Sequence, residues 1–167
     1  MLPYYDSNNI TCYNTIVTTK IQKGRIKKQP RKLPGAAAPK EYKSRESKLY
    51  STVYLRVYRQ TKVFYESLIG NSHRKPFVKS KYFDTKVFLD EFWAVILRRN
   101  LADRRRRLAF YLCAIDLIRN SKCAPHEKYD SGRTLYEFYG IAKNGERFVV
   151  HIRRGKNGLY FMSCFPK

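Results

Sequence analysis

The sequence predicts an α+β domain in which N-terminal helices pack on a C-terminal antiparallel β-meander of three to four strands. We expect residues 49–167 to form this domain and residues 1–48 to form a basic, mostly flexible tail. Three observations predict the organisation. Apolar residues are sparse before residue 49, helical apolar spacing runs over residues 84–122, and strand-like alternation with turn signals follows Pro125.

Charge is the dominant compositional feature. Lys and Arg total 35 against 13 Asp and Glu, so the formal net charge of the 167 residues is +22. A hydrophobic content of 43% is too high for a wholly disordered basic peptide. Residues 1–48 carry +8 and residues 49–167 carry +14, so the predicted domain is itself cationic. The positive electrostatic field of such a domain attracts anions, and nucleic acid is the leading partner.

The tail contains helix breakers and basic clusters. Pro30, Pro34, Gly35 and Pro39 break any helix or central strand. The basic residues between 20 and 48 either attract phosphate without adopting one structure or belong to a solvated linker. A short strand is predicted within residues 10–19 because β-branched residues are frequent there.

Several functional classes are disfavoured. The sequence contains no run of about 18 apolar residues, so it predicts no membrane-spanning helix. The first residues lack the pattern of a signal peptide. The four cysteines form no Cys-x-x-Cys pair, and there is no Walker loop, no His-Glu-x-x-His and no acidic cluster. We therefore expect neither a cofactor nor a metal, and a location in the cytoplasm or delivery into a target cell's cytoplasm.

The first segment of the domain, residues 49–59, fits two periodicities. Leu49, Val53 and Val57 recur every four residues, as on a helix, but they also fit the alternation of a strand. Tyr, Thr and Val favour strands, so we expect strand or mixed structure. Residues 62–69 then predict a short helix, which ends at a Gly-Asn pair.

Residues 84–122 predict two helices. Asp84 is a suitable N-cap, and the apolar residues that follow it have helical spacing. A second helix begins near Asp103, and its apolar stripe extends to Ile118. We expect Trp93 to pack in the core between the two helices.

Four consecutive arginines, Arg104, Arg105, Arg106 and Arg107, lie near the start of the second helix. Four consecutive residues sweep most of a helical turn and cannot share one face. Some of them must point to solvent or to a ligand. A solvated basic face and a phosphate-contacting patch are both open interpretations.

The C-terminal third predicts consecutive antiparallel strands at residues 134–139, 146–153 and 159–165. Asn144-Gly145 and the segment 155–158 supply the turns between them. Helices that precede such a meander pack on one of its faces.

The alternation predicts a candidate site on the opposite face of the sheet. If the even-numbered apolar residues of the second strand meet the helices, His151 and Arg153 lie on the open face. Strict alternation on the last strand allows either Ser163 or Tyr160 to join them.

Nucleic acid is the leading partner, and if this face cleaves RNA without a metal, it needs a base for the ribose 2′-OH, an acid for the leaving 5′-oxygen and cations around the phosphorane. His151 is the candidate base or acid, because histidine titrates near neutral pH unaided. It is alternatively an exposed or merely RNA-contacting side chain. Arg153 or Arg154 is expected to hold the phosphate, and Glu137 or Tyr136 to carry the second proton.

Ser163 either donates to a phosphate oxygen or is an ordinary solvated strand residue. The expected nucleic-acid-binding residues are Arg104, Arg105, Arg106, Arg107, Arg154, Lys156, Tyr136 and Tyr160. The two tyrosines either stack on unpaired bases or pack in the core and across strands.

Six stretches carry a family resemblance. They are residues 82–93, 104–108, 136–140, 144–146, 149–152 and 161–166. In order and spacing they resemble the phage-borne nuclease branch of the barnase–EndoU–colicin–RelE (BECR) superfamily over residues 49–167. The resemblance implies helices followed by a four-stranded antiparallel sheet and a ribonuclease activity without metal. The chain departs from the family at Arg153-Arg154-Gly155, where members have an acidic residue.

Taken together, the residues and the resemblance predict a metal-independent endoribonuclease of the toxin or effector kind, which acts through attack of the 2′-OH on the adjacent phosphate. The alternative is a non-catalytic basic nucleic-acid-binding protein. The expected partners are tRNA or mRNA and a neutralising, acidic antidote protein.

Overall fold

A mixed, curled sheet of seven strands organises the part of the chain that the computed structural model describes, which comprises residues 39–69, 75–130 and 132–167. Its strands are β1 (Tyr42–Lys43), β2 (Phe77–Lys79), β3 (Lys86–Phe88), β4 (His126–Asp130), β5 (Arg133–Ile141), β6 (Arg147–Gly155) and β7 (Gly158–Pro166). The helices are α1 (Tyr54–Ile69), α2 (Asp90–Ile96), α3 (Leu101–Leu108) and α4 (Tyr111–Asn120).

The strand order is β1-β5-β6-β7-β3-β2, and β4 pairs with β5 on the same side as β1. The predicted three consecutive antiparallel strands are present as β5, β6 and β7, but β1 runs parallel to β5 and β3 runs parallel to β7. The predicted architecture is therefore wrong. The protein is α+β, but its sheet is mixed and has seven strands, rather than being an antiparallel meander of three to four strands under the helices.

Strand length explains the error. β1, β2 and β3 contain only two or three residues each, which is too short to display alternation in a sequence. The partners of β1 and the second partner of β3 also lie far along the chain, since β1 pairs with residues 140 and 141 and β3 pairs with residues 159 and 160.

Helix α1 corrects the interpretation of residues 49–59. From Tyr54 onward these residues are helical and continue into the predicted helix at 62–69, so the expectation of strand or mixed structure is wrong there. The buried residues of α1 are Val57, Thr61 and Tyr65, which recur every four positions. The apparent alternation arose because apolar residues such as Leu55 are exposed.

Residues 84–89 are not the start of a helix. Asp84 has a φ of 50° within the turn between β2 and β3, and α2 begins only at Asp90. The predicted N-cap at Asp84 is therefore wrong. Pairing of β3 with β7 overrides the helical spacing that Phe88 shares with later residues.

The predicted second helix is in fact two helices. Asn100 caps α3 through its side chain, which accepts a hydrogen bond from the backbone N–H of Asp103 at 2.9 Å. The helix then breaks at Ala109 and Phe110, and α4 follows. The break allows the ring of Phe110 to stack on Phe148 of β6 at a centroid distance of 5.6 Å.

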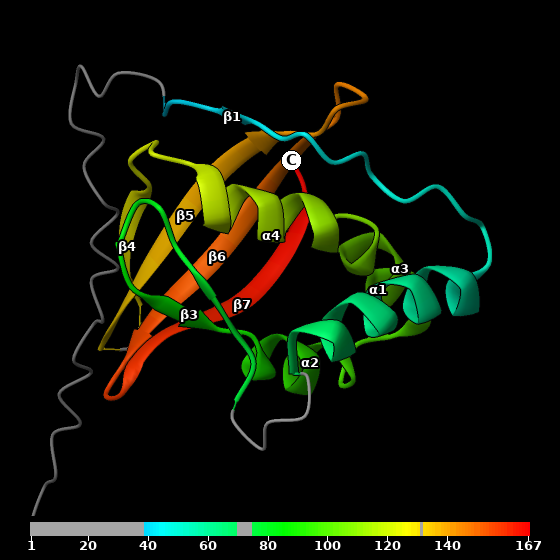
Figure 1. The fold of residues 1–167 in the computed structure, drawn as a ribbon, viewed down its shortest axis with the longest axis horizontal. Helices are drawn as coiled ribbons and strands as arrows, with labels where there is room; N and C mark the ends of the chain where they lie inside the picture. The colour runs from blue at the N-terminus through cyan, green and yellow to red at the C-terminus, as the bar shows by residue number, and fades with distance from the viewer. Residues whose placement is uncertain (1–38, 70–74, 131) are drawn as a thin grey trace, which may run out of the picture. The chain divides into compact units, whose positions relative to one another are not determined.

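The core lies between the helices and one face of the sheet, and α4 runs across that face in Figure 1. Phe92 of α2 stacks on Phe161 of β7 at 4.7 Å between ring centroids. Trp93 is buried against Tyr65 and Tyr111, which confirms the prediction that it packs in the core. No helix in the described ranges is long and apolar enough to cross a membrane.

The last residues before position 49 lie on the domain. Tyr42 pairs with Gly140 at the sheet edge, and the Ser44 hydroxyl donates to Asp116 of α4 at 2.8 Å. Lys48 forms an ion pair with Glu146 at 2.7 Å. The domain therefore begins before residue 49. The expectations for residues 1–38, including the strand at 10–19, lie outside the described residues.

Candidate functional site

A row of four polar side chains crosses four neighbouring strands. His126 of β4 is the cross-strand partner of Glu137 on β5, Glu137 is the partner of His151 on β6, and His151 is the partner of Ser163 on β7. Directly opposed residues point to the same face of a sheet. Since the even-numbered apolar residues of β6 lie in the core beneath the helices, the row lies on the opposite face.

A register shift in the last hairpin brings both candidates of β7 to this face. His151 pairs with Ser163, but Ile152 pairs with Phe161, so Met162 has no partner of its own. Tyr160 is the partner of Arg153 and therefore lies on the same face as Ser163. The expectation of strict alternation along β7 is wrong for this reason.

Glu137 is the most strongly coordinated group of the row. Its carboxylate lies 2.6 Å from Nζ of Lys128 and 3.2 Å from Nε2 of His151, and it accepts a hydrogen bond from the Tyr139 hydroxyl at 2.8 Å. Burial raises its pKa, but these three donors outweigh burial and bring the pKa of Glu137 to about 2. Glu137 is therefore ionised at neutral pH.

The ionised carboxylate orients His151. The ionised carboxylate can only accept a hydrogen bond from Nε2. The neutral imidazole therefore carries its proton on Nε2 and its lone pair on Nδ1. The ring packs edge-on against Phe165 of β7 at a centroid distance of 5.0 Å. His151 is partly exposed, with 22% of its side-chain surface accessible, so a ligand on this face can reach it.

Arg107 reaches the row from α3. Its Nη1 donates to the Ser163 hydroxyl, and its guanidinium lies 5.3 Å from the centroid of the Phe165 ring. Asp103 holds the other side of the guanidinium, with 2.9 Å between Nε and the carboxylate. The structure therefore brings a positioned cation beside Ser163 and His151.

The other three arginines of the α3 cluster diverge from Arg107. Arg104 donates to backbone carbonyls at Leu97 and Arg99, and Arg105 donates to the Thr52 carbonyl at 2.8 Å. Arg106 pairs with Asp103 at 3.1 Å. Consecutive helical positions point in different directions, and only Arg107 of the four makes a contact with the row.

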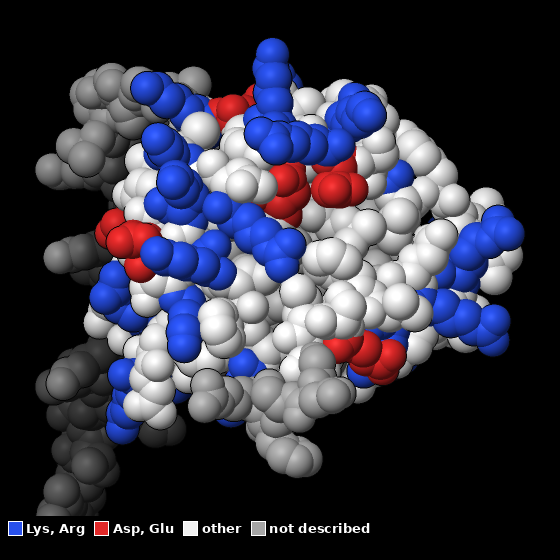
Figure 2. Space-filling view, in the orientation of Figure 1, with Lys and Arg blue, Asp and Glu red and all other residues white. Residues whose placement is uncertain are grey.

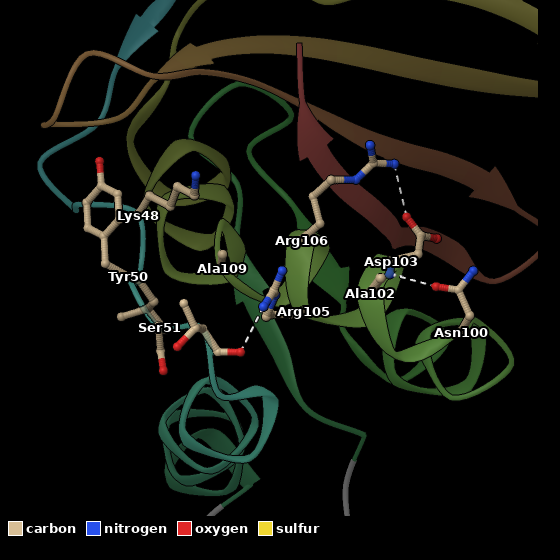
Figure 3. A pocket seen from close by; sticks show the side chains of 11 residues that line it. Lys48, Tyr50, Ser51, Asn100, Ala102, Asp103, Arg105, Arg106 and Ala109 are labelled. Carbon is tan, nitrogen blue, oxygen red and sulfur yellow. Dashed lines mark hydrogen bonds and ion pairs between the residues drawn. The ribbon is translucent and has the colours of Figure 1, made fainter.

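Arg105 and Arg106 instead line a separate hollow of about 760 Å³ between residues 48–52 and α3 (Figure 3). Its wall also contains Lys48 and Tyr50. Asp103 belongs both to this wall and to the ion pair with Arg107, so it links the hollow to the cation that contacts Ser163.

A second hollow, of about 570 Å³, lies at the β6–β7 turn. Four sequence-predicted site residues line it, namely Arg153, Arg154, Lys156 and Tyr160. Arg153 lies two residues from His151 on the same strand and face, and its Nη2 forms an ion pair with Glu91 of α2. These four residues therefore lie beside the row and not within it.

Tyr136 lies away from the row. It is buried on the helix side of the sheet, where its ring packs on Phe83 at 4.9 Å and its hydroxyl accepts from Nε of Arg154 at 2.9 Å. The sequence leaves open whether Tyr136 stacks on bases or packs in the core and across strands. Its surroundings correspond to the packing interpretation.

Sequence reasoning missed the contribution of β4 to the site. His126 and Lys128 alternate on this strand, but no alternating series of apolar residues accompanies them to reveal the strand. It also missed Asp103 as the partner of Arg107, although the spacing of four residues on a helix is a signal for that pair.

Positive charge alone does not locate the site. Figure 2, which views the helix-bearing face, shows Lys and Arg side chains spread over this surface with acidic side chains between some of them. The row on the other face is distinguished instead by contacts that hold ionisable groups in fixed positions.

Two of the three described cysteines belong to the packing, whereas Cys123 is partly exposed. Cys113 and Cys164 are buried free thiols, and burial raises the pKa of Cys113 to about 12 and also raises the pKa of Cys164. Neutral thiols of this kind are poor nucleophiles. Within the described ranges, no group of three or more His, Cys, Asp or Glu side chains is arranged to hold a metal ion.

No protein-family model, curated protein or solved structure matches this chain. The resemblance to the BECR superfamily stays a prediction, and the geometry of the row is what bears on the chemistry of the site.

Proposed function

We propose that this protein is an endoribonuclease that cleaves RNA through attack of a ribose 2′-OH on the adjacent phosphate. The observation that carries the proposal is the pair formed by His151 and the buried, ionised Glu137. A partly exposed histidine that is oriented by a carboxylate is a suitable proton acceptor.

In the proposed step, Nδ1 of His151 takes the proton of the 2′-OH. The 2′-oxygen then forms a bond to phosphorus, and the bond from phosphorus to the 5′-oxygen of the next nucleotide breaks. Glu137 is a positioning residue in this step, because it fixes the orientation of the ring and stabilises the imidazolium that forms.

The leaving 5′-oxygen needs a proton from a second group. Glu137 is a poor donor because its pKa is about 2, and Tyr136 is buried on the other face of the sheet. His126 is the better choice. It is exposed, and two inter-strand spacings of about 4.8 Å separate its backbone from that of His151. Protonated His126 donates to the 5′-oxygen, and the products are a 2′,3′-cyclic phosphate and a 5′-hydroxyl.

Two cations flank the position of the phosphate. Arg107 comes from the β7 side of the row, and Lys128 comes from the β4 side. Each has N–H groups beyond those used in its ion pair, and such donors stabilise the charge that develops on a phosphorane. These side chains supply the proton transfers and the positive charge, so the proposal requires no metal.

The deciding experiment incubates the purified protein with a short RNA in EDTA and compares it with His151→Ala. We expect the variant to lose about 10²- to 10⁴-fold in cleavage rate, which is the usual contribution of a general base. Arg147→Gln, an exposed change on the same strand and face, is the matched control and should leave the rate unchanged.

The substrate supplies a second control. An oligonucleotide with a single 2′-deoxy position must stay intact at that position, because the nucleophile is missing there. Uncut RNA with the unaltered protein, or equal cleavage by His151→Ala, would overturn the proposal. Salt-sensitive binding of uncut RNA would support the alternative of a non-catalytic nucleic-acid-binding protein.

A further inference from the structure

The hollow at the β6–β7 turn has the composition of an anion site. It is lined by Arg133 at the start of β5, by Arg153, Arg154 and Lys156, and by Glu91, the one acidic side chain among its described lining residues. Four cations against one carboxylate leave a local excess of positive charge. A hollow of about 570 Å³ also falls within the usual range for ligand sites.

Within the described residues, two of these cations have charge that no acidic side chain neutralises. Arg133 and Lys156 are exposed and have no ion-pair partner among the side chains that the structure describes. Arg153 is only partly satisfied, since its Nη2 is paired with Glu91 while its Nε is buried without a hydrogen-bond partner. Positive charge that the protein does not neutralise favours a polyanionic ligand.

An aromatic wall accompanies the charge. Tyr160 lines the hollow, and its ring packs on Phe88 at a centroid distance of 5.6 Å, which fixes its position. A positioned aromatic ring beside cationic groups is typical of sites that bind unpaired nucleotides, because the base stacks while the phosphate is held.

The hollow also has a defined position relative to the proposed cleavage row. Arg153 and His151 are two residues apart on β6, so their backbones are about 6.6 Å apart along the strand. Both side chains lie on the same face. An RNA strand that lies along β6 and has one phosphate at His151 would place a neighbouring phosphate near the hollow.

We propose that this hollow binds the phosphate group next to the scissile one in an unpaired RNA strand. This inference rests on the proposed function, which places the scissile phosphate at His151. It adds a second binding subsite and a preference for single-stranded RNA, because a base in a duplex remains in its stack and cannot reach Tyr160.

The test measures binding of 2′-O-methyl oligonucleotides, which cannot undergo attack by a 2′-OH, by fluorescence anisotropy. The double variant Arg133→Ala/Lys156→Ala removes two exposed cations of the hollow. Arg56→Ala/Arg59→Ala removes two exposed cations of α1 and is the control for net charge. For a single-stranded tetranucleotide, we expect the first variant to bind about tenfold more weakly and the control to bind within about twofold of the unaltered protein.

Two further measurements sharpen the result. Loss of one phosphate contact should lower the slope of log affinity against log salt by about 0.7. A dinucleotide with a single internal phosphate should bind the unaltered protein and the first variant equally, because it has no neighbouring phosphate to lose.

The outcomes separate the two proposals. Equal weakening by the two double variants, or equal affinity for single strands and hairpin duplexes, would overturn the subsite while leaving any cleavage intact. If the unaltered protein cuts no RNA but Arg133→Ala/Lys156→Ala selectively weakens the tetranucleotide, the cleavage proposal fails and the phosphate site stands.

Discussion

His151 and Glu137 are direct cross-strand partners on β6 and β5, and 3.2 Å separates Nε2 of the imidazole from Oε1 of the carboxylate. Lys128 approaches the same carboxylate from β4 at 2.6 Å. One buried acid therefore ties three strands together on the open face of the sheet.

The stability of the protein should depend on the ionisation of Glu137. The folded state lowers its pKa from 4.5 to about 2, so its stabilising contribution is present above pH 4.5 and is lost as the pH falls to 2. A shift of this size corresponds to at most about 3 kcal/mol. Urea unfolding at pH 7, 4 and 2.5 should reveal this loss in the unaltered protein and a much smaller loss in Glu137→Gln.

Glu127→Gln is the matched control for that series, because Glu127 is an exposed acid on the neighbouring strand. It should show the same pH dependence as the unaltered protein. The same pH dependence in Glu137→Gln would contradict the role of the buried carboxylate.

His126→Gln should slow the cleavage of a short RNA, because His126 donates a proton to the leaving 5′-oxygen in the proposed step. The loss should nearly disappear for a substrate in which sulfur replaces that 5′-oxygen, since a thiolate leaves without a proton. The measurement is kcat for the two substrates with the unaltered protein and the variant. Equal losses on both substrates would contradict the role of His126 as the proton donor.

Arg107→Ala should lower the rate of cleavage about 100-fold, because it removes a positioned donor beside the phosphorane. Arg107→Lys should recover only part of the rate, since a single ammonium cannot reproduce the contacts to both Ser163 and Asp103. Arg106→Ala is the control. It shares Asp103 as a partner but is mostly exposed, and we expect an effect within about threefold. Equal losses in Arg106→Ala and Arg107→Ala would indicate an effect of charge rather than position.

Gly140→Ala should destabilise the fold. An added Cβ would lie 2.4 Å from the ring of Phe148, which is buried and stacked on Phe110 and has no room to move. We expect a cost of about 1–3 kcal/mol in the free energy of unfolding. At Gly132 a Cβ meets nothing within 4 Å, so Gly132→Ala should cost only the strain of its φ of +78°, about 1 kcal/mol. Denaturant titration of both variants distinguishes crowding from backbone strain.

The meander and its two faces follow from the sequence by itself. In β6, the apolar residues at every second position from Phe148 to Ile152 lie in the core, and the turns between β5, β6 and β7 carry glycines that adopt positive φ values. Burial on one face is a local pattern with a period of two, so the alternation alone assigns His151 and Arg153 to the open face.

Only the tertiary structure decided how that face is completed. The short strands β1 and β3 pair with β5 and β7, β4 brings His126 and Lys128 beside Glu137, and Arg107 alone of its cluster reaches Ser163. None of these contacts follows from a periodic pattern, because they join segments distant in the chain through hydrogen bonds and ion pairs between polar side chains. A sequence records the local periodicity of burial, whereas the partners of polar groups depend on which elements pack side by side.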